Sequence, residues 1–124
     1  MKSILRLAGV AGFLGVALGA FGAHALHPRL ESLGTAWIWD RAVFYHLIHA
    51  VVLLALGMGQ QPVRRWIPIV FTAGIVLFSG SLYVLALTNI KVLGAITPFG
   101  GACFIAGWIG VACCAARTVE SAQK

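Results

Sequence analysis

The sequence predicts an all-α membrane protein, a four-transmembrane-helix bundle with a short interfacial helix between the first and second spans. Of its 124 residues, 60% are hydrophobic and only 10% are charged, against about 25% in ordinary soluble domains. Four apolar stretches each approach the ~20 residues that a helix needs to cross a hydrocarbon core. A chain of this length has room for one domain. We therefore expect a single membrane domain over residues 1–124, with spans at about 4–25, 42–59, 67–87 and 95–116.

The first apolar stretch allows two interpretations. Lys2 and Arg6 precede it and Ala23-His-Ala25 ends it, which is also the pattern of a cleaved signal peptide. However, the apolar run is longer than a usual signal-peptide core, and its glycines have a helix-packing spacing. We therefore interpret it as a retained transmembrane helix.

The other helices are separated by turn signals. Segment 27–34 resembles a short surface helix that ends at a glycine, and Thr35 begins the helix that leads into the second span. Trp37 and Trp39 are expected at the level of the lipid headgroups, where an indole is partly hydrated. Thr97-Pro98 predicts the first turn of the fourth helix, with threonine as the N-cap and proline next to it.

The distribution of charge argues for lipid as the partner and against nucleic acid. The net charge is +6, but the basic residues are scattered at the ends of the apolar stretches and form no stripe with aromatic residues. Because successive spans alternate in direction, six basic residues fall on one side of the membrane, namely Lys2, Arg6, Arg64, Arg65, Arg117 and Lys124. The other side receives three, Arg29, Arg41 and Lys91. The excess predicts that both termini are cytoplasmic.

Small residues recur at helical spacing in the first and fourth spans. In lipid, helices associate through close backbone contact, which small residues permit. The two predicted packing seams consist of Gly12, Gly15, Gly19 and Gly22 in the first span, and Gly100, Cys103, Gly107 and Gly110 in the fourth. These seams either pack the bundle internally, or one of them is a homo-oligomer interface. The cysteines, all in the last apolar stretch, are interpreted as packing residues.

Polar side chains are expected to gather at one depth, because the first and third spans end on the side where the second and fourth begin. This candidate functional cluster consists of His24, Tyr45, His46, His49, Ser79, Ser81, Tyr83 and Thr97. A histidine as deep as His49 is expected to be neutral and hydrogen-bonded. Three roles remain open for the cluster: hydrogen bonding between helices, proton-linked or ligand-binding activity, and metal or haem ligation.

Four motifs, in order, resemble one known family. They are Gly19-Ala-Phe-Gly-Ala-His24-Ala, Tyr45-His-x-x-His49-Ala, Phe78-Ser-Gly-Ser-Leu-Tyr83-x-Leu-Ala-Leu, and Thr97-Pro-x-Gly-Gly101 followed by Ala106-Gly-Trp108. Together they resemble the domain-of-unknown-function family 423, small bacterial membrane proteins with a mitochondrial relative. The resemblance implies a fold and a location in the bacterial cytoplasmic membrane, but no reaction. Many bacterial relatives have glutamine at the position of His46, which argues against an indispensable role for that imidazole.

Three functions compete on these observations. A non-enzymatic accessory protein, or a factor for membrane or complex integrity, is favoured because the chain has only three acidic residues and no nucleophile paired with a base. Its partners would be a second copy or a membrane complex, and no cofactor is expected. The alternatives are a haem- or metal-associated redox protein that uses His24, His46 and His49, and a small oligomeric transporter or proton-linked channel.

Overall fold

The computed structural model describes residues 2–59 and 63–122, with side chains described up to residue 114. Its helices are α1 (Lys2–Ala23), α2 (His27–Leu33), α3 (Ala36–Met58), α4 (Trp66–Gly74), the π-helical turn η1 (Ile75–Ser79), α5 (Gly80–Thr88), the 3₁₀ turn η2 (Lys91–Ala95) and α6 (Thr97–Ala122). Within the described residues, four helical segments are long and apolar enough to cross a membrane. The predicted class, a four-helix membrane bundle, is confirmed.

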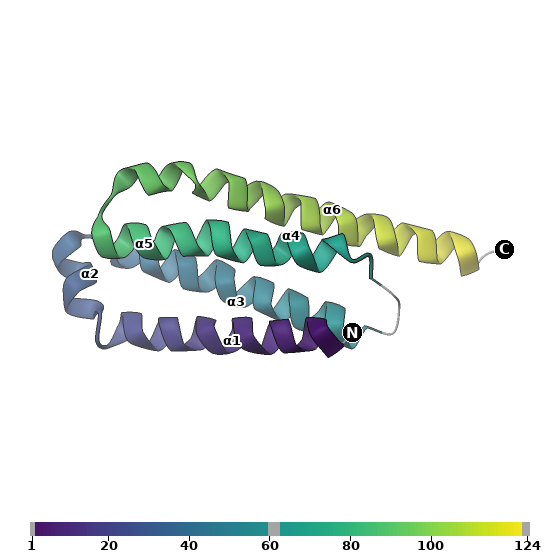
Figure 1. Ribbon diagram of the computed structural model, residues 1–124, viewed down its shortest axis with the longest axis horizontal. Coiled ribbons are helices and arrows are strands. Elements are labelled where there is room, and N and C mark those ends of the chain that lie inside the picture. The colour runs from purple at the N-terminus through teal and green to yellow at the C-terminus, as the bar shows by residue number, and fades with distance from the viewer. Residues whose placement is uncertain (1, 60–62, 123–124) are drawn as a thin grey trace.

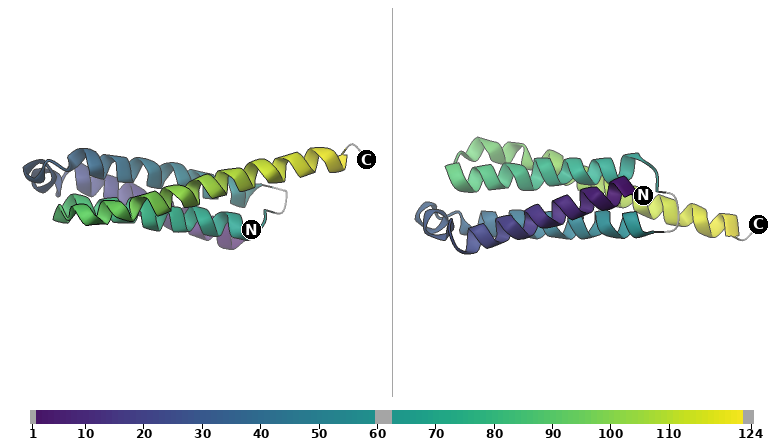
Figure 2. Two further views of the ribbon diagram at one scale, coloured as in Figure 1. Left: turned by 90° about the horizontal axis from the view of Figure 1, so that it is seen from above. Right: turned by 60° about the horizontal axis from the view of Figure 1, so that its bottom comes forward.

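The helices form an elongated bundle in which neighbours along the chain run in opposite directions (Figure 1). Helix α1 packs mainly against α3, whereas α4, η1 and α5 form one continuous third span between α3 and α6. The beginning of α1 and the end of α6 lie at the same end of the bundle, and α2 lies at the opposite end (Figures 1 and 2). We refer to these as the terminal end and the α2 end.

The short helix α2 is the predicted interfacial helix, which is thereby confirmed. Proline stands in its first turn, where a missing N–H costs nothing. Gly34 ends it in the left-handed conformation, with φ 66°, and its N–H reaches the carbonyls of Leu30 and Glu31. A residue with a side chain would be strained at that φ, so glycine is the natural end of this helix.

The second long helix begins where the sequence predicted, directly after Thr35 and ahead of the second apolar stretch. Helix α3 starts at Ala36, because the segment that includes Trp37 and Trp39 continues without a break into the apolar run. Trp37 is 62% exposed, as expected of a residue at the headgroups, but Trp39 is only 2% exposed. Trp39 instead donates its Nε1–H to the Leu18 carbonyl of α1 at 3.0 Å. Because the helix begins before the apolar stretch, the polar residues of α3 lie near the middle of the helix.

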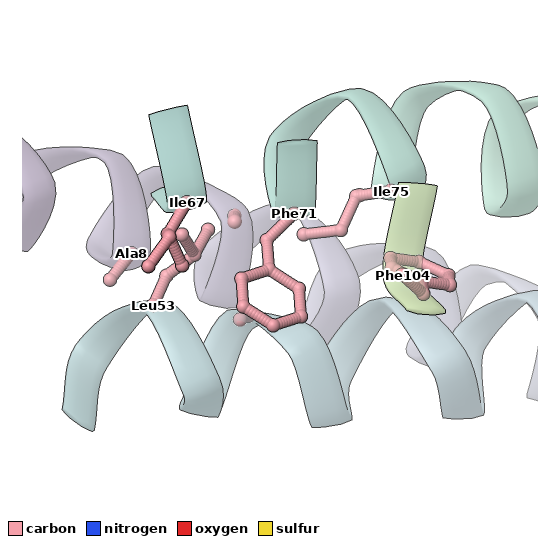
Figure 3. Close-up of a cluster of buried hydrophobic side chains, with 8 residues drawn as sticks. Ala8, Leu53, Ile67, Phe71, Ile75 and Phe104 are labelled. Carbon is pink, nitrogen blue, oxygen red and sulfur yellow. The ribbon is translucent and has the colours of Figure 1, made fainter. Parts of the chain in front are cut away.

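Buried side chains form two clusters along the bundle. The larger consists of Ala8, Ala11, Ala50, Leu53, Ile67, Phe71, Ile75 and Phe104. Figure 3 shows Ile67, Phe71 and Ile75 pointing from the third span towards α3, with Phe104 of α6 beside them. The smaller cluster, at the α2 end, joins Leu30, Trp39, Ala42, Tyr83 and Ala86. Large apolar side chains such as Phe13 and Val51 are exposed on the outside, as lipid-facing residues are.

The small residues of the first span divide into two sets. A Cβ on Gly15 would lie 2.6 Å from Leu47, one on Gly19 would lie 3.2 Å from Val43, and one on Gly22 would collide with the Trp39 indole. These three glycines therefore face α3 and allow α1 to approach it closely. A Cβ on Gly12 would meet nothing within 4 Å, so this glycine lies off that contact.

The fourth span uses its glycines against the third. Gly107 lies against Phe71, where a Cβ would come within 2.8 Å of the ring, and Gly110 lies against Trp66. Gly100 differs from these two glycines, because a Cβ there would collide with backbone atoms, those of Phe78, and not only with a side chain. Cys103, which lies between Gly100 and Gly107 in the sequence, is half-buried. The interface between α6 and the third span thus depends on glycine for its spacing.

Candidate functional site

Two buried side chains from different spans form the central polar contact. His46 of α3 and Tyr83 of α5 are 5% and 9% exposed, and His46 Nδ1 lies 3.2 Å from Tyr83 Oη. The backbone of Ala11 in α1 is a second hydrogen-bonding partner of the imidazole. The contact between His46 Nδ1 and the Tyr83 hydroxyl joins α3 to α5 through a buried side-chain hydrogen bond. His46 therefore connects three spans.

His49 has a different environment, one turn further along α3. Its Nδ1 donates to the Tyr45 carbonyl at 2.8 Å. The imidazole stacks on Phe104 of α6, with ring centroids 3.5 Å apart and planes within 5°. The rings of Phe71 and Trp108 also lie beside His49, with centroids 5.7 and 6.4 Å from that of the imidazole. His49 is thus part of an aromatic cluster between α3, α4 and α6.

Tyr45 contributes to this cluster through its ring. The ring is half-buried, 4.6 Å from that of Phe78 and 6.2 Å from that of His49, centroid to centroid. Its backbone carbonyl, and not its hydroxyl, is what binds His49. Aromatic pairs in these arrangements add roughly 0.5–1.5 kcal/mol each beyond the area they bury.

Two serines in the third span behave differently from each other. Ser81 Oγ lies 2.8 Å from Thr97 Oγ1, which joins α5 to the start of α6. Ser79 is fully buried, and its Oγ has no hydrogen-bond partner among the described residues. Ser79 ends the π-helical turn η1, in which Gly80 N–H reaches back five residues to the Ile75 carbonyl. Such wide turns shift the side chains that follow them around the helix.

His24 is the one member of the predicted cluster that stands apart. It lies in the turn after α1, where it is exposed. His46 and His49 also point to different neighbours, Tyr83 in one case and Phe104 in the other. Among the described residues, no three His, Cys, Asp or Glu side chains are placed to hold a metal ion together. The three histidines therefore do not form one ligand set.

Sequence reasoning missed a polar contact at the α2 end. Thr35, which was expected only to begin a helix, is 3% exposed and donates its hydroxyl to the Ala86 carbonyl at 2.6 Å. Arg29 of α2 approaches the Leu87 carbonyl at 3.4 Å. Both carbonyls belong to the last turn of α5, where helix carbonyls lack partners within the helix. The loop after the first span therefore caps the third, a long-range pairing for which the sequence has no local signal.

Removing this cap is expected to weaken the bundle. Thr35→Val keeps the shape of the side chain but leaves the Ala86 carbonyl without its buried donor. We expect the free energy of unfolding in detergent micelles to fall by about 1–3 kcal/mol. Ser32→Ala is the matched control, because Ser32 bonds only the nearby Arg29 carbonyl and is exposed; its effect should stay within about 0.5 kcal/mol. Equal effects of the two variants would contradict the assignment of Thr35 as a cap.

The fold and these contacts define a small multi-pass membrane protein whose spans are joined by buried side-chain hydrogen bonds and aromatic stacking. The chain belongs to the family described as protein of unknown function DUF423, whose model matches residues 18–101. This confirms the resemblance suggested by the four motifs. The matched residues include every member of the predicted polar cluster.

Curated relatives support the same assignment over most of the chain. A UPF0382 membrane protein of Staphylococcus saprophyticus is 42% identical over 112 residues, which are 88% of this chain and 92% of the relative. The UPF0382 membrane protein YwdK of Bacillus subtilis is 40% identical over 94% of this chain and 98% of its own length. The UPF0382 inner membrane protein YgdD of Escherichia coli is 40% identical over 86% and 84%. No solved structure matches the chain.

Proposed function

We propose that this protein is a non-enzymatic accessory factor that binds other transmembrane helices and supports the integrity of a membrane complex. The observation that carries the proposal is the glycine face of α1 that the bundle leaves unused. A Cβ on Gly9 or Gly12 would meet nothing within 4 Å. Both line a groove of about 430 Å³ between α1 and α3.

This groove has the features of a surface for helix association. Val16 and Val51 on its rim are 62% and 63% exposed. Between them the two glycines bring the backbone of α1 to the surface, which allows another helix to approach closely. Gly15, Gly19 and Gly22 already pack against α3, so Gly9 and Gly12 are the α1 glycines that remain available to a partner helix. The proposal includes no cofactor and no reaction.

The proposal also includes an orientation. The terminal end of the bundle, where α1 begins and α6 ends, is the end expected to hold six of the nine basic residues. The positive-inside rule supports a cytoplasmic location for this end. The α2 end would then face the opposite side of the membrane.

Association is tested by filling the groove with side chains. The double variant Gly9→Leu, Gly12→Leu should fold, because neither new Cβ meets a neighbour, but it should block a partner helix. We expect wild-type protein extracted in a mild detergent to migrate as a dimer or with a co-purifying membrane protein. The double variant should lose that association and keep its thermal stability.

Ala102→Leu is the matched control, since Ala102 is an exposed small residue on the lipid-facing side of α6. It should leave the association intact. A wild-type protein that is monomeric and free of partners, both in mild detergent and after cross-linking in the native membrane, would overturn the proposal.

A further inference from the structure

A small pocket lies at the terminal end of the bundle, between the start of the third span and the end of the fourth. Its volume is about 250 Å³. Trp66, the first residue of α4, forms one wall, and the α6 residues Ile109, Gly110, Cys113 and Cys114 form the other. Helices α4 and α6 lie side by side here (Figure 1). Their contact is close, because the Trp66 indole packs on Gly110, where a Cβ would collide with the ring.

A charged side chain completes the lining of this pocket. Arg64, two residues before α4, is exposed and lines the pocket, whereas its neighbour Arg65 is exposed and does not. The acidic residues whose side chains the structure describes, Glu31 and Asp40, belong to α2 and to the start of α3, at the opposite end of the bundle. Within the described part of the chain, the Arg64 guanidinium therefore has no carboxylate to pair with at the pocket.

The pocket lies at the depth where the hydrocarbon core meets the headgroups. The third apolar span begins at Trp66 and the fourth ends at Cys114, so both walls come from residues at the ends of spans. A tryptophan at the end of a span is typical of this depth. Ile109, on the other wall, is 58% exposed, as expected of a residue that faces acyl chains. The rim of the pocket is therefore apolar at Ile109 and positively charged at Arg64.

A ligand that matches both parts of this rim is amphipathic and negatively charged. A guanidinium binds a phosphate group through charge-assisted hydrogen bonds, which are often bidentate. A free phosphate ion would leave the apolar wall uncovered, whereas the glycerol backbone and the first acyl carbons of a phospholipid cover it. A zwitterionic headgroup also brings an ammonium, which the two arginines repel. The rim therefore favours a phospholipid with a net negative charge.

We propose that the pocket between the start of α4 and the end of α6 binds an anionic phospholipid. The lipid phosphate accepts hydrogen bonds from the Arg64 guanidinium, the glycerol backbone lies against Trp66, and the acyl chains follow Ile109. This is more specific than the general attraction of basic residues to anionic membranes, because only one of two adjacent arginines lines the pocket. The inference goes beyond the proposed accessory function and does not rest on it, because the groove at Gly9 and Gly12 lies between α1 and α3.

Binding is tested on the full-length protein, purified in an uncharged detergent and freed of co-purified lipid. The probes are phosphatidylglycerol, phosphatidylethanolamine and inorganic phosphate, each titrated separately, and bound molecules are counted by native mass spectrometry. We expect phosphatidylglycerol to bind about tenfold more tightly than phosphatidylethanolamine, and inorganic phosphate not to displace it. Arg64→Gln should weaken the binding of phosphatidylglycerol about tenfold, which is the value of one charge-assisted hydrogen bond.

Arg65→Gln is the matched control, because it removes the same charge from the adjacent exposed residue outside the pocket. It should weaken the binding of phosphatidylglycerol by less than about threefold, since only screened attraction is lost. Cys113→Phe should fill the pocket and weaken binding, whereas Ala102→Phe, on the same helix but outside the pocket, should not. All four substituted residues are exposed, so each variant should unfold at the temperature of the wild type.

Four results would each overturn the proposal. They are equal affinity for the two lipids, displacement of phosphatidylglycerol by inorganic phosphate, equal losses in the Arg64 and Arg65 variants, and unaltered binding in Cys113→Phe. The double variant Gly9→Leu, Gly12→Leu should leave lipid binding unchanged, and Arg64→Gln should leave partner association unchanged. The lipid site and the accessory function can therefore fail separately.

Discussion

Gly100→Ala is expected to lower the free energy of unfolding by about 2–3 kcal/mol, at the upper end of the cost of overpacking. The new methyl would collide with the backbone N and Cα of Phe78, which cannot rotate away as a side-chain tip can. Either α6 moves outwards along its whole contact with the third span, or the helix bends. The measurement is equilibrium unfolding of the purified protein by SDS in mixed micelles.

Gly101→Ala is the matched control for this prediction. The two glycines are adjacent in the same helix, so both substitutions gain the same helix propensity, at most about 1 kcal/mol. A Cβ on Gly101 would come only within 3.9 Å of the Phe78 ring, which is an ordinary contact. We expect this variant to be as stable as the wild type or slightly more so. If Gly100→Ala also kept the stability of the wild type, this would contradict the close approach of α6 to the Phe78 backbone.

His49→Ala is expected to lower the free energy of unfolding by about 3 kcal/mol. The imidazole is 4% exposed and fills the space between Tyr45, Phe71 and Phe104. Its removal leaves a cavity and ends the stack with Phe104. The same SDS titration measures the loss, and the near-ultraviolet circular dichroism of the aromatic cluster should weaken with it.

His49→Phe separates a packing role from a chemical one. Phenylalanine keeps a planar ring for the stack but loses the hydrogen bond to the Tyr45 carbonyl, which lies within the same helix. We expect this variant to retain most of the stability and all of the partner association. Full stability of His49→Phe with loss of association or of a cellular phenotype would show that the imidazole nitrogens, and not the ring, are what the protein uses.

Much of the fold could be predicted because lipid imposes simple rules. Each span must be helical and about 20 residues long, and its ends are marked by charge, glycine or proline. Gly34 and the segment before it predicted α2 for the same reason, since only glycine adopts the left-handed conformation without strain. Thr35 likewise predicted the start of α3, and Trp37, Asp40 and Arg41, which precede the apolar run, belong to the same unbroken helix.

The contacts of the polar residues could not be predicted from the sequence to the same extent as the fold. Depth alone grouped eight polar residues, but depth does not say which way a side chain points. The structure pairs His46 with Tyr83 and Ser81 with Thr97, places His49 in an aromatic stack, and leaves His24 exposed in a turn. These differences arise from the rotation of each helix about its axis and, in the third span, from the π-helical turn before Ser81.

The sequence by itself determined that this is a helical membrane protein of four spans and which family it belongs to. Those properties follow from composition, length and local turn chemistry, which each segment carries alone. Only the tertiary structure decided that the first-span glycines are divided between an internal contact and an open face. It also decided that Thr35 caps a helix 51 residues away. Both outcomes depend on how the helices pack, because packing between spans assigns a partner to each face.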